Sequence, residues 1–124
     1  MKIVGMSVPV LTSDIESAIA RYGALLRTEV KARFAIPERG LTVAVLEGVT
    51  LIAGTERDLA PLKQVRATFT VDSLAEFEAH VRATGGTIVQ PATPTPAGRN
   101  MVVRDAEGAV FELVELRGVQ RAKP

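Results

Sequence analysis

The sequence has no cysteine and no tryptophan, and its 124 residues include a single histidine, His80. The absence of cysteine excludes disulfides, thiolate nucleophiles, iron–sulfur clusters and the usual thiolate sites for structural zinc. A single histidine excludes any metal site that needs two imidazoles from one chain. His80 falls inside a predicted helix, where we expect it to be partly exposed. The composition therefore argues against the common thiol and metal enzymes.

An excess of charge of one sign is also lacking, because 15 Lys and Arg residues stand against 14 Asp and Glu residues. This balance gives no electrostatic footprint for nucleic acid, although Arg117, Arg121 and Lys123 form a small basic tail that we expect to be solvated. No stretch is long and apolar enough for a membrane span or a signal-peptide core. We therefore expect a cytoplasmic protein that binds neither nucleic acid nor membrane.

What the sequence does contain is enough apolar residues, 47% of the chain, to build the core of one domain of this length. Period-two and helical patterns predict the same order of elements twice, a strand, a helix and three further strands. In the first half the strands are expected at residues 3–12, 27–34, 41–46 and 49–53, with the helix at 15–26. In the second half the strands are expected at residues 66–71, 87–90, 100–104 and 110–116, with the helix from residue 74.

The ends of the helices carry their own signals. Ser13 and Glu16 fit a capping box at the start of the first helix. Asp72 or Ser73 caps the second helix, and Gly85-Gly86 ends it. Between these elements we expect a linker at residues 58–64, a loop rich in proline at residues 91–96, and a tail at residues 117–124.

The two halves can be overlaid. Residues 8–15 align with residues 67–74, with apolar residues matching on one face, and residues 47–52 align with residues 107–112. The register changes by one residue between these overlaps, which indicates a structural repeat. We therefore predict one α+β domain made of two βαβββ modules, at residues 1–57 and 65–116.

This arrangement resembles the vicinal oxygen chelate superfamily, which includes glyoxalase I, extradiol dioxygenases, fosfomycin-resistance enzymes and bleomycin-resistance binding proteins. The segments at residues 8–14 and 70–74, each running into a helix, carry part of the resemblance. The rest lies in residues 96–113, which look like the family's "GR…DPDG…EL" ending with Ala106 and Glu107 in place of Pro and Asp. The resemblance implies concave sheets that hold a ligand, and a homodimer.

In members that use a metal, each module supplies one ligand from its first strand and one from its last. The resemblance places these ligands at Ser7, Ile52, Arg66 and Glu112. Only Glu112 is a competent ligand, because Ile52 has no donor atom, Ser7 is a poor neutral donor and Arg66 repels a cation. We therefore predict no metal and no cofactor, and no typical glyoxalase or dioxygenase chemistry.

The remaining candidates are assigned to the same concave face. Arg66 and Glu112 either neutralise each other as a buried ion pair, or Arg66 binds a carboxylate, phenolate or carbonyl of the ligand. Alternation puts Arg99 and Met101 on one face of their strand and Asn100 on the other, and it does not decide which face lines the pocket. The predicted ligand-binding residues are Ser7, Pro9, Ile52, Arg66, Thr68, Arg99, Met101 and Glu112.

Two classes of function fit these residues. The first is a metal-independent protein that binds a partly aromatic or apolar small molecule, as the drug-sequestering, bleomycin-resistance members do. The alternative is an enzyme of the superfamily, a lyase, isomerase or dioxygenase acting on a small organic substrate. Such an enzyme either uses Glu112 and Arg66 for acid–base chemistry, or is a metal-dependent lyase or dioxygenase whose ligands lie at other positions.

Overall fold

The computed structural model describes residues 1–118, which form eight strands and three α-helices. They divide into two compact units, which we describe separately. Unit 1 comprises Met1–Met6 and the described residues from Val65 onward, and unit 2 comprises Ser7–Gln64. Strand β1 (Ile3–Thr12) contributes to both units. The element order confirms the predicted α+β fold with two βαβββ repeats.

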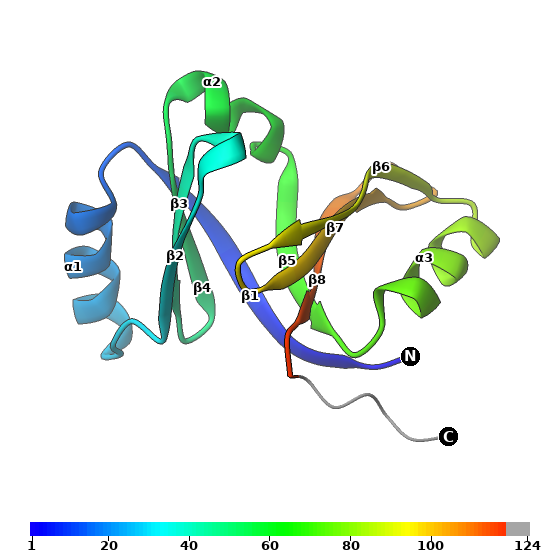
Figure 1. Cartoon of the computed structure of the whole chain (residues 1–124), viewed down its shortest axis with the longest axis horizontal. Coiled ribbons are helices and arrows are strands. Elements are labelled where there is room, and N and C mark those ends of the chain that lie inside the picture. Colours follow the sequence, from blue (N-terminus) through cyan, green and yellow to red (C-terminus); the bar gives the residue numbers. More distant parts are fainter. Residues whose placement is uncertain (119–124) are drawn as a thin grey trace. The chain divides into compact units, whose positions relative to one another are not determined.

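Unit 2 is a sheet with one long helix on one face (Figure 1). Its strand order is β2 (Ala32–Ile36), β3 (Leu41–Leu46), β4 (Val49–Ala53) and β1, with β1 and β4 parallel and the other pairs antiparallel. Helix α1 (Ile15–Leu26) packs its apolar side on this sheet. The buried residues of this core are Ala18, Ala44, Leu46, Val49 and Leu51.

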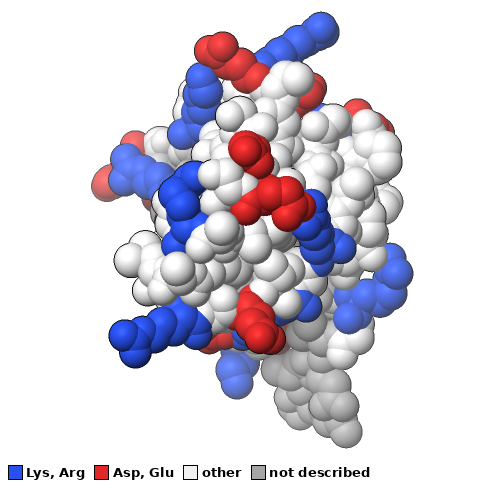
Figure 2. Space-filling view, turned by 90° about the vertical axis from the view of Figure 1, so that its left-hand side faces the viewer, with Lys and Arg blue, Asp and Glu red and all other residues white. Residues whose placement is uncertain are grey.

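The outer surface around α1 is charged with both signs. Figure 2 shows that Lys and Arg side chains are interspersed with Asp and Glu side chains on this face. Ion pairs join Glu16 of α1 to Arg33 of β2, and Lys31 to Glu47. Exposed pairs of this kind contribute little to stability, so the buried apolar face holds α1 in place.

The first helix has the expected bounds, but its N-cap lies one residue later than the capping box predicted. Asp14, not Ser13, is the N-cap, and its carboxylate accepts a hydrogen bond from the Ser17 backbone N–H at 3.1 Å. Asp14 adopts the extended backbone conformation that an N-cap requires, and aspartate caps as well as serine does. For the second helix, α3 (Leu74–Ala83), the sequence left Asp72 and Ser73 as candidate caps, and the structure shows that Ser73 is the N-cap.

Residues 58–64, expected as a linker, fall largely within helical structure that begins at Glu56. This structure consists of α2 (Glu56–Leu59) and a 3₁₀ helix (Ala60–Leu62). Thr55 caps α2 by accepting from the Asp58 N–H. Leu59 is buried against the face of the sheet opposite α1, in a cluster with Ile36, Leu41, Val43 and Ile52. The segment is folded rather than irregular, because two leucines three residues apart, Leu59 and Leu62, pack it onto the sheet.

Unit 1 repeats the plan with α3 on one face of its sheet (Figure 1). The strand order is β1, β5 (Val65–Val71), β8 (Val110–Leu116), β7 (Gly98–Arg104) and β6 (Thr87–Thr95). Strands β5 and β8 are parallel, and β6–β7 and β7–β8 are antiparallel. The core below α3 consists of Val71, Leu74, Met101, Val103 and Leu113.

The loop expected at residues 91–96 is mostly strand. Strand β6 continues through Pro91 and Pro94 to Thr95 and pairs with β7. It is the edge strand of the sheet, where a residue without an N–H is tolerated, and its register shifts twice. The loop prediction was wrong because proline excludes a central strand but not an irregular edge strand.

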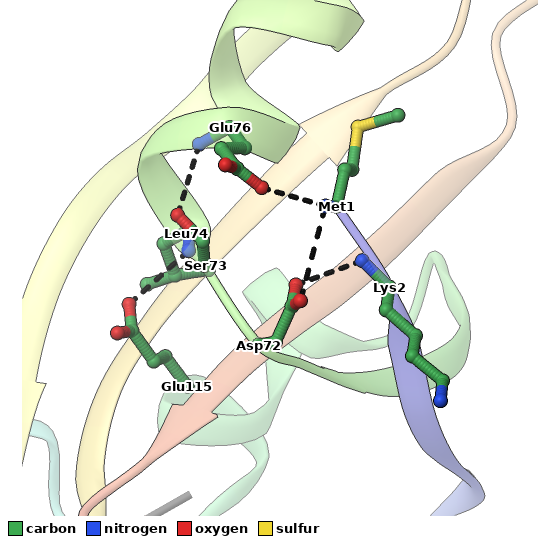
Figure 3. Close-up of polar contacts among 7 residues, drawn as sticks. All are labelled: Met1, Lys2, Asp72, Ser73, Leu74, Glu76 and Glu115. Atoms are coloured by element: carbon green, nitrogen blue, oxygen red, sulfur yellow. Dashed lines mark hydrogen bonds and ion pairs between the residues drawn. The ribbon is translucent and has the colours of Figure 1, made fainter. Parts of the chain in front are cut away.

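Polar contacts tie Met1 and Lys2, which precede β1, to the start of α3 (Figure 3). Asp72, which is 2% exposed, accepts a hydrogen bond from the Lys2 backbone N–H at 2.8 Å. The Met1 amine lies 2.7 Å from the Glu76 carboxylate. These contacts explain why Met1–Met6 belong to unit 1, whereas the sequence analysis assigned them to the first module.

None of the helices within residues 1–118 has the length and apolar character needed to cross a membrane. The basic tail was expected at residues 117–124, and its members Arg121 and Lys123 lie outside the described residues.

Candidate functional site

Glu112 lies on the face of the unit 1 sheet that no helix covers. Its neighbours in β8, Phe111 and Leu113, pack below α3, and alternation along the strand puts Glu112 on the opposite face. The strands of this unit contain one other acidic residue, Glu115. Glu115 faces α3, where it accepts from the Leu74 N–H at 3.1 Å. Glu112 is therefore the acid of the open face within the described strands of unit 1.

Both oxygens of the Glu112 carboxylate accept hydrogen bonds. The Thr68 hydroxyl donates to Oε1 at 3.0 Å, and Asn100 Nδ2 donates to Oε2 at 2.9 Å. The two donors come from the strands on either side, and they are 6% and 5% exposed. Hydrogen bonds to a charged group contribute about 1.5–3 kcal/mol each. The two hydrogen bonds hold the carboxylate in place. A carboxylate has about four lone-pair positions, so Glu112 keeps free lone pairs that can accept a proton from a substrate.

The Asn100 side chain is itself bound from the edge strand. Gln90 Nε2 in β6 lies 3.3 Å from Asn100 Oδ1 and 3.4 Å from Thr93 Oγ1. The Thr93 hydroxyl donates in turn to the Pro91 carbonyl oxygen at 2.8 Å. Glu112, Asn100, Gln90 and Thr68 thus form one polar network across four strands, which we call the Glu112 network.

Arg66 does not pair with Glu112. Within residues 1–118 no ion pair joins the two side chains, and Arg66 is exposed. A bulge in β5 between Val65 and Thr68 interrupts the alternation that was expected to put Arg66 and Thr68 on one face. The Arg66 guanidinium is therefore available to a ligand, as one of the two alternatives of the sequence analysis requires.

The charge of Arg66 acts on the turn between β7 and β8. Backbone N–H groups of Ala109 and Glu107 donate to Asp105 and hold its pKa below the usual range. The Arg66 guanidinium lowers the pKa of Asp105 further, as a smaller effect. Arg66 thus lies near this turn, at the end of the sheet where β8 begins.

Two predicted binding residues lie on the other face of unit 1. Met101 is 0% exposed and belongs to the core below α3. Arg99 forms an ion pair with Glu115, with 3.0 Å between Nη2 and Oε2. The alternation that the sequence left open is thereby decided, because Asn100 and not Met101 shares the face of Glu112.

The predicted residues of unit 2 have mainly packing contacts. The Ser7 hydroxyl lies 2.6 Å from the Thr50 hydroxyl, and Pro9 pairs with Thr50 in the β1–β4 ladder. Ile52 is 5% exposed and packs in the cluster that Leu59 covers. A separate open hollow of about 720 Å³ lies by the first residues of α1 and α2, and none of these three residues lines it.

The residues at the four expected ligand positions do not fit a divalent metal ion. Ser7 is bound to Thr50, Ile52 has no donor atom, Arg66 is a cation, and both Glu112 oxygens accept from neutral donors. Over residues 1–118, no three His, Cys, Asp or Glu side chains gather closely enough to hold a metal ion. A single carboxylate does not hold such an ion at useful affinity.

Sequence reasoning identified Thr68 and Glu112 but left Asn100 undecided and missed Gln90. An asparagine in the apolar run Asn100–Val103 was a signal for a buried polar contact, since such a side chain needs a partner. Gln90 gave no signal, because two register shifts in β6 direct its side chain toward Asn100.

Comparison with known proteins identifies structural relatives. The chain matches no family model and no curated protein. An uncharacterized protein from Methanosarcina mazei is 36% identical over 99% of this chain and 100% of its own, with a TM-score of 0.87. Methylmalonyl-CoA epimerase from Mycobacterium tuberculosis is 21% identical over 93% of this chain and 89% of its own, with a TM-score of 0.76.

A variant of Streptomyces coelicolor methylmalonyl-CoA epimerase, in complex with 2-nitronate-propionyl-CoA, is also similar. It is 18% identical over 98% of this chain and 100% of its own, with a TM-score of 0.78. The likeness to the two epimerases shows a common fold. The likeness to the Methanosarcina mazei protein, at higher identity over the full length, shows a common family.

Proposed function

This chain belongs to the vicinal oxygen chelate superfamily, and we propose that it is an enzyme that moves a proton on a small organic substrate. The observation that carries this proposal is the Glu112 carboxylate, half-buried on the open face and held through both oxygens. Fixed geometry of this kind is what a general acid–base group needs. The epimerases of the same fold support an isomerase-type reaction, the alternative in the sequence analysis, over non-catalytic binding.

The chemistry of a carboxylate base restricts the substrate class. A carboxylate removes a proton from carbon only when a neighbouring carbonyl acidifies that carbon. In the proposed step the C–H bond breaks and the proton moves to Glu112, while the electron pair moves to the carbonyl oxygen as an enolate. Glu112 then exchanges this proton with solvent, and the enolate electron pair takes a proton back from Glu112 to form the new C–H bond and restore the carbonyl.

Arg66 is proposed to bind an oxygen of this substrate. Its guanidinium has no ion pair with Glu112 in the described part of the chain, and its charge reaches the end of the same sheet. A guanidinium stabilises a carboxylate or a developing enolate through charge-assisted hydrogen bonds. Thr68 and Asn100 are proposed to hold Glu112, so the proposed site consists of Thr68, Arg66, Asn100 and Glu112.

The proposed reaction uses no metal at the family's usual position. The support is the set of side chains at that position, which offers one carboxylate, already hydrogen-bonded, and one cation in unit 1. Metal analysis of protein purified without chelator is expected to find less than one equivalent of zinc, iron, nickel or manganese. A stoichiometric metal would contradict this part of the proposal.

Proton exchange with solvent distinguishes an enzyme from a binding protein. The protein is incubated in D₂O with methylmalonyl-CoA, whose acidic carbon lies beside a thioester carbonyl, and deuterium uptake is followed by mass spectrometry. We call this the exchange assay. Uptake well above the rate without protein supports the proposal. Saturable binding of methylmalonyl-CoA or bleomycin in calorimetry without exchange would instead support the sequestering protein.

A homodimer is proposed as the assembly. Val4, Met6 and Val8 lie at alternate positions of β1 and are 47%, 67% and 55% exposed. An apolar row on one side of a strand is a common feature of an interface. Light scattering after gel filtration is expected to give about twice 13.2 kDa, and the monomer mass would contradict the proposal. The cytoplasmic location stays a prediction for cell fractionation to test.

A further inference from the structure

In the Glu112 network, the hydrogen bonds that run from Gln90 in β6 through Asn100 to Glu112 all donate in one direction, toward Glu112. An ionised carboxylate only accepts hydrogen bonds, so Asn100 must turn its Nδ2 toward Glu112. Its Oδ1 then faces β6, where only a donor satisfies it. Gln90 supplies that donor with Nε2, 3.3 Å away. Each amide can point in two ways, and the Gln90 donor on β6 favours the orientation of Asn100 that Glu112 requires.

The other end of the network is fixed by the backbone. Gln90 Nε2 also lies 3.4 Å from Thr93 Oγ1, and the Thr93 hydroxyl donates to the Pro91 carbonyl oxygen at 2.8 Å. Because that hydroxyl proton is committed to Pro91, Thr93 can only accept from Gln90. The Gln90 amide is therefore oriented before any ligand binds.

The strand that carries Gln90 is distorted on both sides of it. The pairing of β6 with β7 shifts between Ile88 and Gln90, and again between Gln90 and Thr93. Bulges of this kind re-aim a side chain and are common beside active sites. A regular β6 would pair Ile88 and Gln90 with residues two apart on β7, whereas they pair with the neighbours Val103 and Val102.

We propose that Gln90 is a positioning residue that acts through Asn100 to orient the Glu112 carboxylate for proton transfer. The inference rests on the proposed function for its catalytic consequence, while the orientation of Asn100 can be measured on the protein alone. Gln90 itself lies one residue away from Glu112 in the network and need not touch the substrate. Its effect is on the turnover rate rather than on substrate affinity.

The test replaces Gln90 with methionine, which has similar length and no donor. Thr87→Met in the same strand is the matched control, because Thr87 is exposed and pairs with Arg104 at the far end of β7. The first measurement is the side-chain amide ¹⁵N–¹H signal of Asn100, assigned by its loss in Asn100→Asp. We expect Gln90→Met to shift this signal and to speed the exchange of its protons with water, and Thr87→Met to leave it unchanged.

The second measurement is the exchange assay. Gln90→Met is expected to lower kcat about threefold to tenfold, the effect of one hydrogen bond, with KM within about twofold. Gln90→Glu, which reverses the polarity at β6, is expected to lower kcat further. An unchanged Asn100 signal in Gln90→Met overturns the inference, as does a loss that appears in KM alone.

The two measurements separate the inference from the proposed function. If the native protein shows no exchange with methylmalonyl-CoA, the proposed function fails. The Asn100 signal then still decides whether Gln90 orients this amide. A shifted signal with unchanged kcat would contradict the catalytic part of the inference and leave the proposed function standing.

Discussion

At the scale of single residues, the site depends on how neutral side chains hold one carboxylate. Thr68 and Asn100 are almost fully buried, and their donors face Glu112 from both sides. A buried donor that loses its acceptor, or an acceptor that loses its donor, costs more than a surface contact does. The geometry of Glu112 is therefore tied to the stability of unit 1.

Replacing Thr68 with valine keeps the shape of the side chain and removes the donor to Glu112 Oε1. We expect the free energy of unfolding to fall by about 1–3 kcal/mol, the cost of a buried group left without its partner. Thr68→Ser, which keeps the hydroxyl, is expected to recover most of this loss. The measurement is urea unfolding.

Thr70→Val is the matched control, two residues further along β5. It is expected to change the free energy of unfolding by less than Thr68→Val does, because Thr70 is not a partner of Glu112. Equal losses in the two variants would show that the Thr68–Glu112 hydrogen bond contributes no more than a generic β5 threonine.

Asp105 makes stability depend on pH. Hydrogen bonds from the Ala109 and Glu107 N–H groups lower its pKa in the folded protein, and Arg66 adds to this effect. Because the folded pKa lies below the unfolded one, the contribution is fully present above the unfolded pKa of about 3.9. It is lost as pH falls through the folded pKa.

We therefore expect Asp105→Asn to lower the melting temperature at pH 6 and to have a smaller effect near pH 2. Thermal unfolding followed by circular dichroism at several pH values measures this. A difference between native and variant protein that stays constant from pH 6 to pH 2 would contradict the assignment.

At the scale of elements, regular patterns were predictable and irregular ones were not. The expected bounds of β1, β3, β4 and β8 agree with the structure, because alternation of apolar residues directly reflects one buried face. Strand β6 was predicted only as far as Gln90, and helix α2 was missed. In β6 the prolines were taken to end the strand, although they lie in an irregular edge strand. In residues 56–62 the charged residues outweighed Leu59 and Leu62, which pack on the sheet.

The same limit explains which site residues were predictable. Glu112 followed from the family resemblance and Thr68 from alternation, which holds in β8 and in the second part of β5. The relation of Arg66 to Glu112 did not follow, because the bulge between Val65 and Thr68 is set by the packing of neighbouring strands. Gln90 depended on two such shifts.

Residues 56–62 are held on the sheet by Leu59, so removing this side chain is expected to destabilise the protein. Leu59→Ala is expected to lower the free energy of unfolding by about 2–4 kcal/mol, because Leu59 is 7% exposed in its cluster. Leu25→Ala, at a side chain that is 72% exposed in α1, is the control, with a change of about 0.5 kcal/mol or less. Equal effects in urea unfolding would mean that the segment is a linker.

At the scale of the whole molecule, the chain has the fold of a superfamily whose metal-using members hold the metal at four positions, and only one of these positions carries a carboxylate here. The chain has one histidine and no cysteine, and neither residue type occurs at the four usual ligand positions, which are Ser7, Ile52, Arg66 and Glu112. The fold is shared with methylmalonyl-CoA epimerases. Within the described strands of unit 1, Glu112 is the one acidic residue on the face that no helix covers. The central claim is that this acid moves the proton.

The exchange assay with Glu112→Gln tests that claim most directly, with Glu115→Gln as the matched control in the same strand. Glutamine keeps the size of Glu112 but cannot take up a proton, so deuterium uptake is expected to fall by about 100-fold or more, the usual contribution of a general base. Glu115→Gln is expected to retain activity within about threefold. Uptake in Glu112→Gln equal to that of the native protein would contradict the account.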